Sequence, residues 1–136
     1  MEDDTEHDAR RAATEALARA WNRLDPGVVA PFLSEDVSYE SVETELHLVG
    51  KRQVMANLER KAELITAAGE GAEVWAEVGS LPAPADQRYP CVISRQGGGG
   101  RTALFLLRFT TDGLIERVEV VTSDPDAAVG SGDFPS

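Results

Sequence analysis

The sequence predicts an α+β domain in which helices come first and hairpin-linked strands follow. In the first half, apolar residues recur every three or four positions, as in the stripe from Ala9 to Leu24. In the second half the apolar period becomes that of strands, and Thr111-Asp112-Gly113 is a tight hairpin signal between two of them. Because strands joined by hairpins pair antiparallel, the expected sheet is antiparallel.

Three helices are expected before this sheet. The first begins with Thr5 as a plausible N-cap and stops at Asp25-Pro26-Gly27. Pro26 cannot continue that helix but suits the first turn of a short second one, with Asp25 as its cap. The third helix follows Gly50 and ends near Gly69, since glycine favours the helix C-terminus.

The strands are marked by runs of β-branched and aromatic residues between turn-rich connections. The expected strands are Val37–Ser41, Glu73–Val78, Tyr89–Arg95, Thr102–Thr110 and Leu114–Thr122. The stretch Val42–Val49 alternates too loosely to be assigned.

A chain of 136 residues is expected to form one domain. We expect an acidic tail over residues 1–8, a folded domain over 9–122 and a flexible tail over 123–136. The net charge is −11, but eight of the acids lie in the two tails, which leaves the body nearly balanced. Its bases are scattered, and doublets such as Arg60-Lys61 are expected on solvated helix faces. Proteins that bind nucleic acid carry a clustered basic face instead, so no nucleic-acid partner is expected.

Composition also bears on the compartment. The longest apolar run, Ala103–Leu107, is far shorter than the roughly 20 residues of a membrane span, so no membrane contact is expected. Met1-Glu2-Asp3-Asp4 is the opposite of a signal peptide, and Cys91 is the single cysteine. We therefore expect a cytoplasmic protein in which Cys91 is a reduced core residue.

Several segments carry a family resemblance: Trp21–Asp25 leading to Val29–Val37, then Val49–Val54, and finally Arg108–Ile115. Their order and spacing over residues 9–122 resemble the nuclear transport factor 2-like superfamily in its SnoaL-like branch, a cystatin-like α+β fold. The resemblance implies a strongly curved sheet wrapped around helices, forming a cone with a pocket at its open end. That superfamily includes ketosteroid isomerase, polyketide cyclases and non-catalytic binding or assembly modules, so the fold does not give the function.

Ketosteroid isomerase chemistry needs a carboxylate base, a tyrosine and a protonated aspartate. Aligned on the same segments, these positions fall on Ser41, Leu17 and Phe105. Serine without its own base does not take a proton at neutral pH, and leucine and phenylalanine donate nothing. The sequence therefore argues against that isomerisation.

One polar cluster remains as a candidate for chemistry. If the chain stays extended over Tyr39–Val49, one face carries Tyr39, Ser41, Glu43, Glu45 and His47. His47 could then act as a general base oriented by a glutamate, or the cluster could bind a divalent metal. Alternatively the glutamates lie in an exposed loop and His47 points to solvent. On balance we expect no metal and no cofactor.

The first functional hypothesis is a domain that binds a small hydrophobic molecule. The resemblance places a pocket wall at Leu17, Trp21, Phe32, Tyr39, Ser41, His47 and Phe105. One alternative is a lyase, isomerase or hydrolase for a hydrophobic substrate, with His47 as the catalytic base. Another is a non-catalytic assembly module whose pocket is plugged by Trp21, Phe32 and Phe105. The sequence does not decide whether the protein is an enzyme.

The run Ala103–Leu107 is apolar on both faces of its strand. A sheet covered by helices on one side should alternate apolar and polar residues, so the second face also needs cover. We therefore expect a homodimer that forms through the outer face of the sheet.

Overall fold

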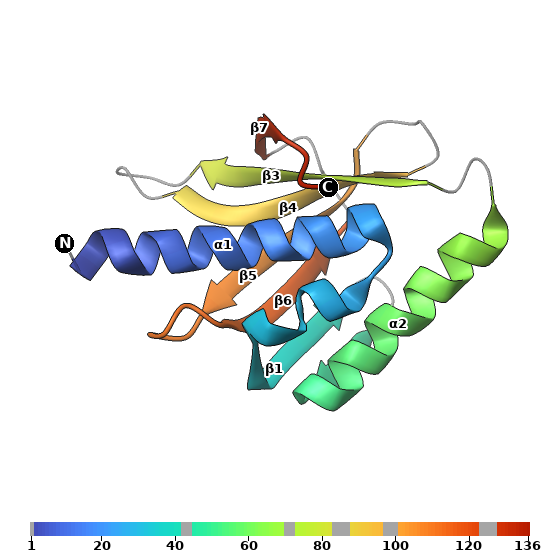
Figure 1. Cartoon of the computed structure of the whole chain (residues 1–136), viewed down its shortest axis with the longest axis horizontal. Helices are drawn as coiled ribbons and strands as arrows, with labels where there is room; N and C mark the ends of the chain where they lie inside the picture. The colour runs from blue at the N-terminus through green and yellow to red at the C-terminus, as the bar shows by residue number, and fades with distance from the viewer. Residues whose placement is uncertain (1, 42–44, 70–72, 83–87, 97–100, 123–127) are drawn as a thin grey trace.

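The computed structural model describes residues 2–41, 45–69, 73–82, 88–96, 101–122 and 128–136, and the structural statements below concern these residues (Figure 1). Two α-helices are present, α1 (Glu2–Arg23) and α2 (Lys51–Ala68). Two 3₁₀ turns, η1 (Pro26–Val28) and η2 (Ala30–Phe32), follow α1. The strands are β1 (Leu33–Ser41), β2 (Leu46–Val49), β3 (Val74–Pro82), β4 (Arg88–Gln96), β5 (Arg101–Phe109), β6 (Ile115–Val121) and β7 (Val129–Asp133).

The strands form one mixed sheet in the order β2-β1-β6-β5-β4-β3-β7. All neighbouring pairs are antiparallel except β1 and β6, which are parallel. The expectation of a wholly antiparallel sheet is therefore wrong at this pair. The reason is that β1 and β6 are distant in the chain, so no hairpin sets their direction.

Where the sequence predicts three helices, the structure has two α-helices and two 3₁₀ turns. Asp25 caps η1 as expected, with its Oδ1 accepting from the Gly27 amide at 3.2 Å. Pro31 lies inside η2, and a proline inside a helix lacks the N–H for an α-helical hydrogen bond. The segment therefore makes two tight turns and enters β1 at Leu33, earlier than the expected start at Val37.

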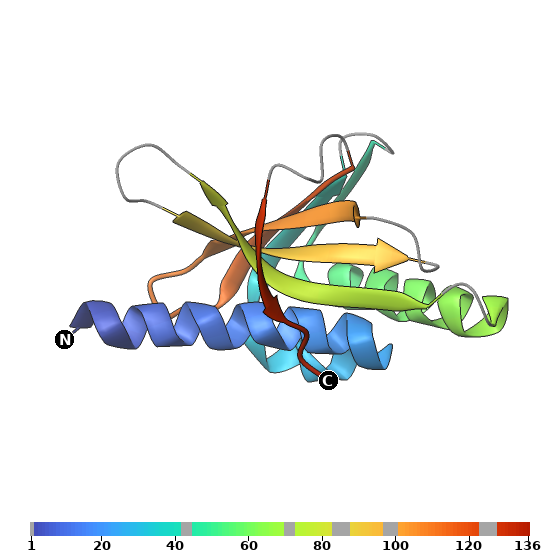
Figure 2. The same ribbon diagram turned by 90° about the horizontal axis from the view of Figure 1, so that it is seen from above.

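Both ends of the chain belong to the described fold. Residues 2–8 are part of α1. At the other end, β7 pairs antiparallel with β3 and leads the last residues back to α1 (Figure 2). The side chain of Asn22 donates to the Pro135 carbonyl at 2.5 Å and also bonds the backbone of Ala76. Residues 129–136 thus contribute β7 and contacts with α1, and the division of the chain into an acidic tail, a domain over 9–122 and a flexible tail stays a prediction.

The main hydrophobic core lies between the curved sheet and the helices, which cover one of its faces (Figure 2). We call this covered side the inner face. On the opposite, outer face a smaller buried cluster contains Cys91, Ile93, Leu104 and Ala128. Since Ala128 directly precedes β7, the chain itself covers part of the outer face that the sequence left uncovered.

Candidate functional site

The inner face brings together five of the seven residues expected in the pocket. Leu17 and Trp21 come from α1, Tyr39 and Ser41 from β1, and Phe105 from β5, and all five are buried. The rings of Trp21 and Phe105 are 5.5 Å apart between centroids and tilted by 35°. Such aromatic packing fills the space over the sheet with side chains.

Phe32 and His47, the other two, lie elsewhere. Phe32 is half-buried at the edge of the core. His47 lies opposite Glu40 in the pairing of β1 with β2, whereas Tyr39 and Ser41 lie opposite Leu48 and Leu46. The expected common face of Tyr39 and His47 is therefore wrong, because the chain turns back and His47 points outward. Glu43 lies outside the described residues.

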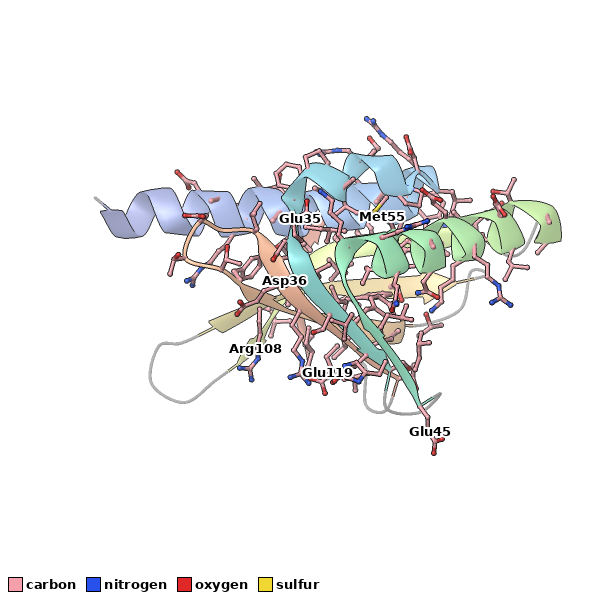
Figure 3. All side chains as sticks on the ribbon, turned by 90° about the horizontal axis from the view of Figure 1, so that it is seen from below. Glu35, Asp36, Glu45, Met55, Arg108 and Glu119 are labelled. Carbon is pink, nitrogen blue, oxygen red and sulfur yellow. The ribbon has the colours of Figure 1, made fainter. Side chains whose placement is uncertain are left out.

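Because His47 points outward, it lies beside Glu40 on the outer face and not in the interior. Its Nε2 is 3.4 Å from Glu40 Oε1, and 60% of its side chain is exposed. Arg117 donates to the other oxygen of Glu40 at 2.5 Å. Arg108 and Glu119 also point away from the helices (Figure 3). From this face His47 cannot reach a molecule bound on the inner face, so the geometry does not support its role as a base there.

The cavity nearest the core is small and lies between α1, η1 and α2. A cavity of about 10 Å³ is lined by Leu17, Ala20, Trp21, Pro26, Leu58 and Ala62. This volume is about that needed for one water molecule, and far below the roughly 300 Å³ at which ligand pockets begin. This cavity therefore has no room for an organic molecule as it stands.

An open groove lies next to this cavity, between the end of α1 and the second half of α2. It has a volume of about 430 Å³ and is lined by Leu24, Pro26, Glu59, Ala62, Glu63, Thr66 and Ala67. Pro26 and Ala62 border both spaces. The groove therefore approaches the small cavity from outside, along the flank of α2.

Several polar atoms on the inner side are buried without a hydrogen-bond partner. They include Trp21 Nε1, Tyr39 Oη and Asn57 Nδ2. Tyr39 is 1% exposed, and burial raises the pKa of its phenol well above the ordinary value. A buried donor without an acceptor costs about 1–3 kcal/mol. These atoms mark places where an acceptor from a bound molecule would be stabilising.

Lys61 is a site residue that the sequence analysis assigned to the solvated surface. It is half-buried, and its Nζ lies 5.5 Å from the centroid of the Tyr39 ring. Burial lowers the pKa of its ammonium group. Within the described ranges no carboxylate lies within ion-pair distance of this ammonium. The spacing of Lys61 could have indicated this position, because it follows Leu58 by three residues and Val54 by seven. Both of these residues are buried, so Lys61 lies next to the buried face of the helix.

The described part of the chain contains no cluster of three or more His, Cys, Asp or Glu residues that could hold a metal ion. Neither of its α-helices is long and apolar enough to cross a membrane.

No protein-family model matches the chain, and none of the curated proteins does. Solved structures do match. A SnoaL-like protein of unknown function from Burkholderia thailandensis is 17% identical, with a TM-score of 0.62 over 85% of this chain and 94% of that one. An NTF2-like protein of unknown function from Cytophaga hutchinsonii is also 17% identical, with a TM-score of 0.56 over 86% and 91% of the two chains.

A computationally designed 17-OHP binder is 16% identical, with a TM-score of 0.58 over 92% of this chain and 98% of that one. At such low identities the likeness concerns the fold. The chain has the α+β fold of nuclear transport factor 2-like proteins, and SnoaL-like proteins are among its structural neighbours. This agrees with the resemblance read from the sequence.

Proposed function

We propose that the protein binds a small apolar molecule between α1 and α2, on the side of the sheet that the helices cover. The observation that carries this proposal is the arrangement of two adjoining spaces. An open groove shares Pro26 and Ala62 with a small, mainly apolar cavity that Trp21 also lines. A ligand entering from the groove would meet the apolar side chains of α1 and α2.

Binding at this place requires side chains to move, because the cavity itself is too small for an organic molecule. Moving α2 away from α1 would join groove and cavity into one pocket. The computationally designed 17-OHP binder supports the idea that this fold can carry a ligand site. Its sequence differs too much for its ligand to be carried over.

Binding is favoured over catalysis by the chemistry of the inner face. A general acid or base works best with a pKa near the operating pH. Burial shifts the pKa of Tyr39 away from neutrality, so its phenol stays protonated and does not act as a base near neutral pH. The alternative of a non-catalytic assembly module is favoured by the same filling of the interior by Trp21 and Phe105.

Fluorescence titration with N-phenyl-1-naphthylamine, a neutral probe for apolar pockets, separates these alternatives. We expect saturable binding of one probe per chain. Ala62→Leu, which narrows the passage between groove and cavity, should weaken binding by about tenfold or more, a loss of about 1.4 kcal/mol. The matched control Ala56→Leu, at an exposed position of the same helix, should bind as the unmodified protein does.

Thermal unfolding of both variants checks that each is folded. Absence of saturable binding to the unmodified protein, or equal binding by the two folded variants, would reject the inner face as a ligand site and leave the assembly module.

A further inference from the structure

Polar groups gather on the flank of α2 that faces β1, away from the groove. Asn57 and Lys61 lie one turn apart on α2, so their side chains project from the same side of the helix. Tyr39 lies opposite them on β1, under the ammonium group of Lys61. The Lys61 ammonium thus lies over the Tyr39 ring, and Asn57 precedes Lys61 by one turn on the same flank of α2.

All three groups present hydrogen-bond donors, and none has a described acceptor. Tyr39 Oη and Asn57 Nδ2 are buried without a partner. In the ranges that the structure covers, no carboxylate lies within ion-pair distance of Lys61. Its ammonium lies over the Tyr39 ring. Unsatisfied buried donors are costly, and a half-buried cation without a counter-ion is costlier still.

Resting on the proposed function, we infer that Lys61, Tyr39 and Asn57 form the acidic-group subsite of the ligand site, so that the bound molecule is an apolar acid such as a carboxylate. A carboxylate has two oxygens with about four acceptor positions, enough for three donors. Its charge would neutralise Lys61, and charge-assisted hydrogen bonds are about twice as strong as neutral ones. The apolar remainder would lie toward Leu58, between this flank and the cavity.

The geometry also explains why the site is not closed by the protein's own acids. The acidic side chains of the neighbouring part of α2, Glu59 and Glu63, lie on the groove side or in solvent. Glu40 alternates with Tyr39 along β1 and is bound to Arg117 on the outer face. Among the described residues, no acid of the chain occupies the position beside Lys61, which an anion from outside the chain could take.

Two matched probes test this inference: 1-naphthaleneacetate, which is an anion at neutral pH, and the neutral 1-naphthaleneacetamide. Their dissociation constants are measured by isothermal titration calorimetry on the full chain. A charge-assisted bond predicts that the acetate binds about tenfold or more tightly than the amide. In Lys61→Met this preference should disappear, so that acetate and amide bind about equally.

Lys61→Arg keeps the charge and should retain most of the preference, which shows that a loss in Lys61→Met comes from charge and not from misfolding. Arg60→Met removes one positive charge from an exposed neighbour and should keep the full preference. Equal binding of acetate and amide, or an unchanged preference in Lys61→Met, would overturn the acidic-group subsite while N-phenyl-1-naphthylamine binding still supports the proposed function. Binding of none of the three compounds would overturn both.

Discussion

Tyr39 and Lys61 make the stability of the fold depend on pH in opposite directions, because burial disfavours the charged form of each side chain. The pKa of Tyr39 is raised, so the folded chain keeps the phenol proton at pH values where the unfolded chain has lost it. The pKa of Lys61 is lowered, so the unfolded chain binds more protons than the folded one in the range up to the ordinary pKa of about 10.4. Stability therefore falls above about pH 10 through Tyr39 and rises with pH below that through Lys61.

Tyr39→Phe tests this linkage. At neutral pH we expect little loss, since the Tyr39 hydroxyl has no partner to lose. Above about pH 10 the unmodified protein should lose up to about 1.4 kcal/mol per pH unit through this residue, and the variant should not. Urea denaturation at several pH values measures both curves. Parallel curves for the two proteins over the alkaline range would contradict the buried position of the phenol.

At the same scale, His47 shows what sequence reasoning could not reach. The alternation that placed His47 beside Tyr39 assumed an unbroken strand, whereas Glu45 adopts a φ of 54° and the chain reverses. A shift of one residue in strand register moves every side chain to the other face. Trp21, in contrast, lies on the apolar stripe of the first helix that the sequence shows, and the structure buries both Trp21 and Tyr39.

Among the elements, β7 was the hardest to predict from the sequence. Its residues Val129–Asp133 include two glycines, and glycine is depleted in strands. The strand exists because β3 offers an edge and because Glu77 of β3 accepts from the Gly132 amide at 2.7 Å. Gly130 leaves room for that carboxylate, since a Cβ there would collide with it. These are tertiary contacts, which no local pattern reports.

The hairpin around Asp112-Gly113, a local signal, is confirmed by the hydrogen bond from the Thr110 amide to the Leu114 carbonyl at 2.8 Å.

Gly130→Ala should therefore destabilise the protein by about 1–3 kcal/mol, the typical cost of overpacking. The cost should shrink in a Glu77→Ala background, where the colliding carboxylate is absent. Urea denaturation of the two single variants and the double variant gives this coupling. Additive losses would mean that Glu77 does not lie under Gly130.

For the whole molecule, we propose the homodimer that the sequence suggested, formed through the outer face. The chain covers Leu104 with Ala128, but Leu106 and Val121 remain half-buried beside this cluster. Glu40, Arg117 and Glu119 form a charged group on the same face. A twofold dimer brings the same patch of both chains together, so acids and bases on one patch can pair with their counterparts.

Analytical ultracentrifugation at micromolar concentration should show a dimer. Leu106→Glu should shift it to monomer, because a charge would be buried in the interface. Ala12→Glu, which adds the same charge at an exposed position of α1, is the control and should stay dimeric. A monomer of the unmodified protein under these conditions would contradict the proposed homodimer.

The most direct measurement is nuclear magnetic resonance of the methyl-labelled protein with 1-naphthaleneacetate. If the ligand lies between α1 and α2, nuclear Overhauser contacts should join the naphthalene ring to the methyl groups of Leu17, Leu58 and Ala62. Contacts confined to Leu104, Leu106 or Val121 would place the compound on the outer face and contradict a binding site between the two helices.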